Sequence, residues 1–305
     1  PDSAPLQGLG RPDLLICCNN TCGSIVKWFQ ALARILQVPL FVLDTPFLPA
    51  DPPTHAVTYV AEQLEDLVRW LEATAGCRLD PAQLHEAMRL GREAALLWRE
   101  IRGLCRARPS PLNAPDLFLH MAPIVTLRGT PQAVTYYRQL RQEVMARVRQ
   151  GVGSVPCECY RLLWDNIAIW PKLSRFFYLF ASRGACFVVD TYTGAWDTVA
   201  EPGEPLESLS RAYIDIFLNR SLDYRCQRMA QLIREYGCDG FVMHNNRSCK
   251  PFSLGEPLAR RRVSEAAGVP GLLIEADMCD TRAYADEQIN TRVAAYCEAL
   301  EERAE

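Results

Sequence analysis

The sequence predicts an α/β protein with two parallel-sheet units and a helical module between them. Short apolar segments alternate with amphipathic helical segments near both ends of the chain, and a long helical stretch separates these two groups. Strands joined by helical crossovers lie parallel in a sheet. With 305 residues, 49% of them hydrophobic, the chain is long enough to bury a core in each unit.

The first unit is predicted over residues 1–50. Residues 13–17 form a short apolar strand, residues 24–36 carry apolar side chains at helical spacing, and residues 38–44 form a second buried strand. A strand, a helix and a strand in this order make a parallel βαβ unit. Residues 51–155 are predicted to be the helical module, with helices over 56–75, 81–106 and 131–150 and a proline-rich link over 108–123.

Residues 156–305 are predicted to form the second α/β unit. The expected strands are 184–192, 239–244 and 271–275, and the expected helices are 173–183, 222–236, 258–267 and 286–303. Residues 161–165 are another short apolar segment, which the sequence does not assign to the sheet. Open parallel sheets of this kind are typical of Rossmann-like and flavodoxin-like folds.

Composition excludes several classes of function. The 33 Lys and Arg residues against 36 Asp and Glu residues give a net charge of −3, so a nucleic-acid partner is not expected. No run of about 18 apolar residues predicts a membrane span, and the first residues lack the features of a signal peptide. We therefore expect a cytoplasmic protein. The chain does not begin with Met, and we expect it to start inside a longer protein.

The 13 cysteines are an odd number, so they cannot all form disulfides within the chain. Free Cys is often a small buried apolar residue, and we expect this of Cys77, Cys105, Cys186, Cys226, Cys238 and Cys297. Cys157 and Cys159 are too close in sequence for most metal sites and are interpreted as structural. The cysteines with a possible function are Cys17, Cys18, Cys22 and Cys249.

Two cysteine-containing loops form the candidate site. Residues 17–23 follow the first predicted strand and residues 244–251 follow the strand 239–244, which is where parallel sheets bind ligands. Cys22 precedes a helix, whose free N–H groups favour a thiolate. Arg247 and Lys250 are expected to lower the pKa of Cys249. These residues leave open an iron–sulfur or other metal site, a nucleophilic cysteine, or buried structural thiols.

Three long segments resemble the 2-hydroxyacyl-CoA dehydratase and benzoyl-CoA reductase family. They are CNNTCGSIVKWFQALARILQVPLFVLDTPF at 18–47, CDGFVMHNNRSCKPFSLGEPLARR at 238–261 and VPGLLIEADMCDTRAYADEQINTRVAAYCEAL at 269–300. Residues 161–170 and 188–196 also fit the resemblance. It implies an iron–sulfur subunit that works with a second homologous subunit, or as a homodimer, and with an ATP-hydrolysing iron–sulfur activator. The activator would supply an electron that converts an acyl-CoA thioester to a ketyl radical anion.

The resemblance leaves open whether this radical leads to loss of water or to reduction of an aromatic ring. Two alternatives also remain: an electron-relay subunit without CoA chemistry of its own, and an α/β binding protein that holds no cluster. The catalytic residues themselves are not predicted.

The resemblance also implies the ligands of a 4Fe-4S cluster. Cys249 would be one ligand and Cys22 a second, with Cys18 as the alternate. Their sulfurs would lie about 6–7 Å apart across the cleft. A further ligand would fall before Pro1, so we expect the chain as it stands to carry no intact cluster. The residues expected to line the cluster or the thioester are Asn245, Asn246, Arg247 and Ser248; alternatively, they form a turn that hydrogen-bonds its own backbone.

Overall fold

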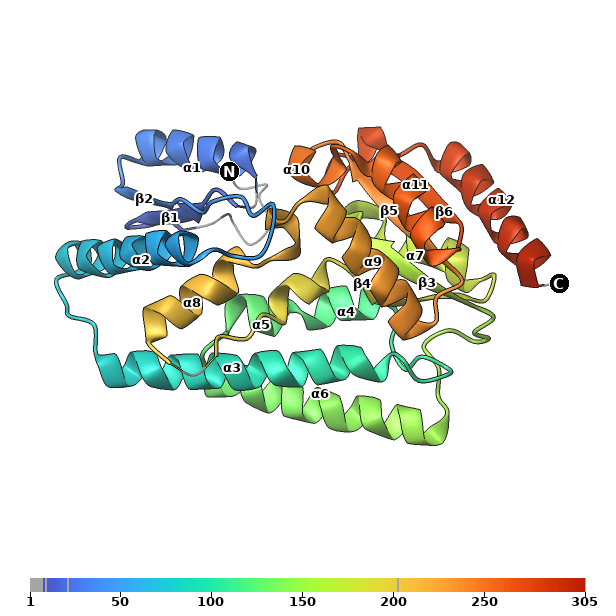
Figure 1. Cartoon of the computed structure of the whole chain (residues 1–305), viewed down its shortest axis with the longest axis horizontal. Helices are drawn as coiled ribbons and strands as arrows, with labels where there is room; N and C mark the ends of the chain where they lie inside the picture. Colours follow the sequence, from blue (N-terminus) through green and yellow to red (C-terminus); the bar gives the residue numbers. More distant parts are fainter. Residues whose placement is uncertain (1–7, 9, 21, 202, 305) are drawn as a thin grey trace.

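The computed structural model describes residues 8, 10–20, 22–201 and 203–304, and these residues form two separate sheets (Figure 1). The small sheet pairs β1 (Leu15–Cys18) with β2 (Leu40–Leu43). The large sheet has the order β4-β3-β5-β6, where β3 is Tyr160–Asp165, β4 is Ala185–Asp190, β5 is Gly240–Asn246 and β6 is Gly271–Ala276. Every pair is parallel, which confirms the predicted α/β class.

Helices surround both sheets. They are α1 (Gly23–Leu36), α2 (Thr54–Ala75), α3 (Pro81–Leu104), α4 (Ala114–His120), α5 (Ala122–Thr126), α6 (Pro131–Gln150), α7 (Leu173–Ala181), α8 (Pro205–Ile214), α9 (Leu222–Tyr236), α10 (Lys250–Ser253), α11 (Glu256–Ala267) and α12 (Asp286–Ala304). Short 3-10 turns are η2 (Trp170–Lys172), η3 (Thr193–Trp196), η4 (Phe217–Asn219) and η5 (Thr281–Ala283). In Figure 1, α1 and α2 lie on opposite sides of the small sheet, and α3 and α6 run side by side. None of the described helices is both long enough and apolar enough to cross a membrane.

Local signals explain where several helices begin. Asn113 and Asp116 form a capping box at the start of α4. The side chain of Asn113 accepts a hydrogen bond from the backbone N–H of Asp116, and the side chain of Asp116 accepts one from the backbone N–H of Asn113. The hydroxyl of Thr130 accepts a hydrogen bond from the backbone of Ala133 at the start of α6. Both helices carry a proline in the first turn, where its missing N–H leaves no helical hydrogen bond unmade.

The main correction to the predicted fold is β3, which lies inside the large sheet between β4 and β5. The predicted strands omitted it. A central parallel strand is usually apolar throughout, but this one has the fully buried charged residues Arg161 and Asp165 near its ends. The two charges interrupt the apolar pattern by which a buried strand is recognised.

Four of the described helices, α4, α5, α8 and α10, occupy segments to which the sequence assigned no helix. The proline-rich segment 108–123 contains α4, and residues 205–214 form α8. α8 packs against α2, and its Ile214 belongs to the apolar core beside the small sheet. The predicted divisions at residues 50 and 155 stay predictions. The packing of α8 on α2 crosses the division at residue 155, and the core that Ile214 shares with Leu43 crosses both.

The large sheet carries an apolar core on each face. Leu163 belongs to the core formed with α3, α6 and α9, whereas Leu162 and Trp164 belong to the core formed with α7 and α12. This division follows from the strand geometry, because successive side chains of a strand point to opposite faces of the sheet. β3 is therefore buried on both sides, and it fixes the position of the loops that follow the neighbouring strands.

Gly271, at the start of β6, allows the ring of Phe241 to lie against the backbone. A Cβ at this position would overlap that fully buried ring. Gly271→Ala is expected to lower the free energy of unfolding by about 1–3 kcal/mol, as overpacking of a core does. Urea denaturation measures the change. Gly23→Ala on α1 is the control, because a Cβ there meets nothing within 4 Å. If the two variants had equal midpoints, the close packing at Gly271 would be refuted.

Candidate functional site

The two predicted cysteine loops lie at the carboxyl ends of strands in different sheets. Cys22 follows β1 and immediately precedes α1, and its sulfur accepts a hydrogen bond from the backbone N–H of Ser24 at 3.3 Å. Cys249 follows β5 and precedes α10. In the view of Figure 1, the labels of α1 and α10 lie on the same side of the molecule, above the two sheets. The small sheet and the large sheet thus each contribute one cysteine to the same region.

Cys22 is close enough to Cys249 to act electrostatically on its thiol. Burial raises the pKa of Cys249, and repulsion from Cys22 and Glu256 raises it further. A hydrogen bond from the backbone of Phe252 and the positive charge of Arg225 oppose this rise. The coupling agrees with the predicted approach of the two loops, while the predicted distance between their sulfurs stays a prediction.

The predicted lowering of the Cys249 pKa by Arg247 and Lys250 is wrong. The net shift is upward, and Arg247 forms an ion pair with Glu275, with Nη2 and Oε1 2.6 Å apart. The cation that favours the thiolate is Arg225 on α9, which sequence reasoning missed. Its guanidinium donates to the carbonyl oxygens of Pro251 and Phe252 at 3.1 and 3.0 Å, directly after Cys249. Arg225 is distant from this loop in the sequence, and only the packing of α9 brings it there.

Cys18 lies in a different environment from the other two thiols. Its sulfur donates a hydrogen bond to Oδ1 of Asn20 at 2.9 Å. The side chain packs against the core beside the small sheet, as does Tyr213 of α8. Burial, together with hydrogen bonding to Cys18, raises the pKa of Tyr213. The role of Cys18 as the alternate ligand stays a prediction.

Asn245 and Asn246 are the last residues of β5, and only Arg247 and Ser248 form the turn that follows it. Oδ1 of the fully buried Asn246 accepts hydrogen bonds from the backbone of Ser248 at 3.2 Å and of Met278 at 3.3 Å. The hydroxyl of Ser248 donates to the carboxylate of Asp277. These contacts fix the loop that carries Cys249. Whether its side chains also line a ligand stays a prediction.

Buried polar side chains lie at the carboxyl ends of β3 and β5. Asp165, Asn166, His244 and Glu256 are all fully buried. Nδ2 of Asn166 donates to the carbonyl oxygen of His244 at 2.7 Å and to Oε1 of Glu256 at 3.2 Å. Burial and repulsion from Asp165 raise the pKa of Glu256 to about 9. Burial lowers the pKa of His244 to about 4. At neutral pH, Glu256 is therefore protonated and His244 is uncharged.

The donor chemistry of the two loops fits an iron–sulfur group, whose usual ligands are Cys thiolates. Cys22 and Cys249 supply two thiols, one from each loop. Among the residues that the structure describes, no set of three or more His, Cys, Asp and Glu side chains is arranged to hold a metal ion. The described residues therefore account for two ligand positions.

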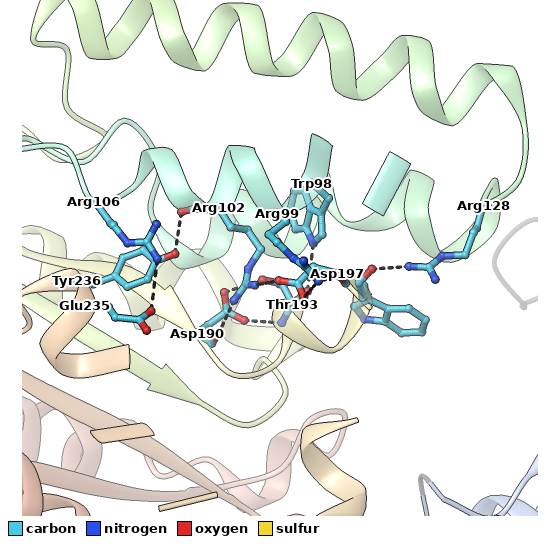
Figure 2. A network of polar contacts seen from close by, with 11 residues as sticks. Trp98, Arg99, Arg102, Arg106, Arg128, Asp190, Thr193, Asp197, Glu235 and Tyr236 are labelled. Carbon is cyan, nitrogen blue, oxygen red and sulfur yellow. Dashed lines mark hydrogen bonds and ion pairs between the residues drawn. The ribbon is translucent and has the colours of Figure 1, made fainter. Parts of the chain in front are cut away.

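A cavity of about 560 Å³ lies between α3, α8 and α9 at the carboxyl end of β4. This volume is typical of small-molecule sites. Figure 2 shows the polar network at one wall: Arg102 of α3 pairs with Asp197 and donates to the carbonyl oxygen of Asp190 at 2.9 Å. The carboxylate of Asp190 in turn accepts hydrogen bonds from Thr193, so the turn after β4 is held against α3.

The cavity is connected to the Cys249 loop through aromatic side chains. Phe217 lines the cavity, and its ring lies 6.0 Å from the ring of Phe252, centroid to centroid. Phe252 follows Cys249 by three positions and packs under Arg225. The arginines that line the cavity are Arg99, Arg102, Arg211 and Arg228. Sequence reasoning missed this cavity, because its walls come from four separate segments.

The fold and the site define an α/β protein with parallel sheets and paired cysteine loops at their carboxyl edges. Residues 3–300 match the family described as 2-hydroxyglutaryl-CoA dehydratase, D-component. The chain belongs to this family, and the resemblance recognised in the sequence is confirmed.

Relatives from several bacteria match almost the whole chain. The (R)-2-hydroxyisocaproyl-CoA dehydratase alpha subunit of Clostridioides difficile is 33% identical over 295 residues, which cover 96% of this chain and 72% of that protein. The (R)-2-hydroxyglutaryl-CoA dehydratase subunit alpha of Acidaminococcus fermentans is 31% identical, covering 95% of this chain and 61% of that protein. A benzoyl-CoA reductase subunit of Thauera aromatica is 28% identical, covering 99% of this chain and 73% of that protein.

Proposed function

We propose that this chain is the iron–sulfur subunit of an ATP-activated enzyme that dehydrates a 2-hydroxyacyl-CoA by a radical route. The proposal rests on the placement of Cys22 and Cys249 in loops after parallel strands and before helices, in a chain whose family match spans residues 3–300. The named relatives support a dehydratase-type complex of several subunits. The similarity to a benzoyl-CoA reductase subunit favours reduction of an aromatic acyl-CoA as the second candidate.

Cys22 and Cys249 would hold a 4Fe-4S cluster, with Cys18 as the third candidate ligand. When bound, such a cluster supplies one-electron chemistry. Arg225 favours the thiolate form of Cys249, and thiolate is the form that binds iron. Protonation of Glu256 keeps a further negative charge away from this region at neutral pH. The chain thus combines a buried cation with a neutral carboxyl group beside the proposed ligands.

The cavity next to the Cys249 loop is the place where we propose that the acyl-CoA binds. CoA carries phosphate groups, and arginine is well suited to bind them through paired N–H donors. Arg99, Arg211 and Arg228 line the cavity and are partly exposed. A second homologous subunit would complete the enzyme, and an ATP-hydrolysing activator would supply the electron.

Anaerobic purification with the partner subunit, followed by iron and sulfide analysis and an absorbance spectrum, tests this proposal. Iron and sulfide together with a broad visible absorbance would support the cluster. ATP-dependent assays with 2-hydroxyacyl-CoA and with benzoyl-CoA then separate the dehydratase from the reductase. A cluster without turnover of either thioester would favour the electron-relay role. A colourless protein without iron would favour the cluster-free binding protein.

A further inference from the structure

We propose that Cys157 and Cys159 form a surface dithiol that exchanges with small disulfides and closes to an intrachain disulfide. Both side chains are exposed, and their sulfur atoms lie 3.4 Å apart. The sequence interpretation of this pair as structural is wrong, because neither thiol is buried. The pair precedes β3 and lies at the amino end of the large sheet. The Cys249 loop lies at the carboxyl end, so the dithiol is separate from the candidate cluster site.

Glu158, between the two cysteines, anchors the segment. Its side chain is only 5% exposed and forms an ion pair with Arg161, and it accepts a hydrogen bond from the backbone of Ser110. Side chains next to each other in a chain that leads into a strand point to opposite sides. The inward direction of Glu158 therefore accounts for the outward direction of both thiols.

Arg161 makes this anchor rigid. Its guanidinium donates to the carbonyl oxygens of Cys105 at 2.8 Å, Ala107 at 3.0 Å and Tyr236 at 2.9 Å. A buried charged pair is stable when its remaining hydrogen-bonding groups are satisfied in this way. The segment that carries the two thiols is thus held by contacts with α9 and with the chain after α3.

Gly184 provides the space for Cys159. A Cβ at Gly184 would lie 2.9 Å from the carbonyl oxygen of Cys157 and 3.0 Å from the sulfur of Cys159. The carbonyl oxygen of Gly184 accepts hydrogen bonds from the backbone of Cys159 at 2.8 Å and of Tyr160 at 3.0 Å. The backbone hydrogen bonds to Gly184 and the buried side chain of Glu158 together hold the two sulfur atoms close to each other in the reduced chain.

The pair has an attacking sulfur and a resolving sulfur. Hydrogen bonding to Cys157 raises the pKa of Cys159, which favours Cys159 as the resolving thiol, and the first attack is assigned to Cys157. Attack on a small disulfide forms a mixed disulfide at Cys157 and releases one thiolate. Cys159 then loses its proton to solvent and attacks the sulfur of Cys157, which releases the second thiolate. The chain loses two electrons, and the small disulfide becomes two thiols.

Oxidised glutathione is the probe, applied to the full reduced chain under anaerobic conditions and followed by alkylation and peptide mass spectrometry. Cys77 is the matched control: the expectation that it is buried is wrong, because its side chain is exposed, and it forms no hydrogen bond with another described thiol. We expect the free thiols of Cys157 and Cys159 to be lost together, and the peptide that carries both to be lighter than its reduced form by two hydrogens. This should occur at a probe concentration about tenfold lower than the one that modifies Cys77.

Single substitutions separate the two sulfurs. Cys159→Ser should retain a mixed disulfide with glutathione at Cys157, whereas Cys157→Ser should leave Cys159 no more reactive than Cys77. Buried Cys105 and Cys186 should stay unmodified, which shows that the chain remains folded. The proposal is overturned if Cys157 and Cys159 of the natural chain each carry a separate glutathione, or if they oxidise no more readily than Cys77.

Discussion

Cys249→Ser should remove nearly all iron from the chain and abolish the activity of the assembled enzyme at the same time. A serine hydroxyl does not ionise near neutral pH, so the soft thiolate ligand is lost. Loss of an outer contact to a metal ligand lowers metal affinity by about 10- to 100-fold, and loss of the ligand itself should exceed this. Iron and sulfide per chain after anaerobic purification, together with turnover in the presence of partner and activator, measure both effects.

Cys226→Ser is the control for this experiment. Cys226 is buried on α9 next to Arg225, but it is not a proposed ligand. The Cys226→Ser variant should retain both iron and activity. Cys22→Ser should behave like Cys249→Ser, and Cys18→Ser decides whether the third candidate is a ligand. Full iron content in Cys249→Ser would disprove the ligand assignment, whatever happened to the activity.

Glu256→Gln should make the folded chain more stable than the natural chain at pH 8, by a few kcal/mol. In the folded chain the pKa of Glu256 is raised to about 9, because of burial and then repulsion from Asp165. An unfolded Glu has a pKa of about 4.3. Between these values the folded state holds a proton that the unfolded state has released, so the natural chain loses stability as the pH rises. Glutamine cannot ionise, and it keeps an acceptor for Asn166.

Urea denaturation at about pH 5 and pH 8 measures this effect. The stability difference between Glu256→Gln and the natural chain should be small at the lower pH and should grow toward the higher one. Arg225 and Asp165 also act on Glu256, and both are present in the two proteins. Glu265→Gln, an exposed position on the same helix, should change stability by no more than about 0.5 kcal/mol at either pH. An equal difference at both pH values would contradict the raised pKa.

Much of the fold follows from local apolar patterns. Residues 184–192, 239–244 and 271–275 were recognisable as strands because their cores are continuous apolar segments, and β4, β5 and β6 occupy them. β3 escaped recognition because Arg161 and Asp165 interrupt its apolar pattern: Arg161 pairs with Glu158 just before the strand, and the cation that acts on Asp165 is the distant Arg225. α4 was hidden by the prolines around it, although a proline in the first turn is compatible with a helix.

Part of the candidate site also follows from local sequence patterns, and part of it does not. The loops with Cys22 and Cys249 were recognisable because each follows a strand and precedes a helix within a few residues. Arg225 and Glu256 come from α9 and α11, and no local pattern connects them to these loops. Asp165 could have been recognised from the sequence. Burying a carboxylate at the carboxyl end of an apolar segment costs free energy unless it has a partner or a function.

The packing of α8 against the small sheet has a consequence for the order in which the chain folds during synthesis. β1, α1 and β2 leave the ribosome before α8, yet Ile214 of α8 completes the core beside them. The backbone of Leu48 likewise pairs with that of Arg220, which follows α8 in the chain. At a synthesis rate of about 5–20 residues per second, α8 follows the small sheet by on the order of ten seconds. Throughout that interval α2 lacks its packing partner α8, so part of the apolar surface of the emerging chain stays exposed to solvent.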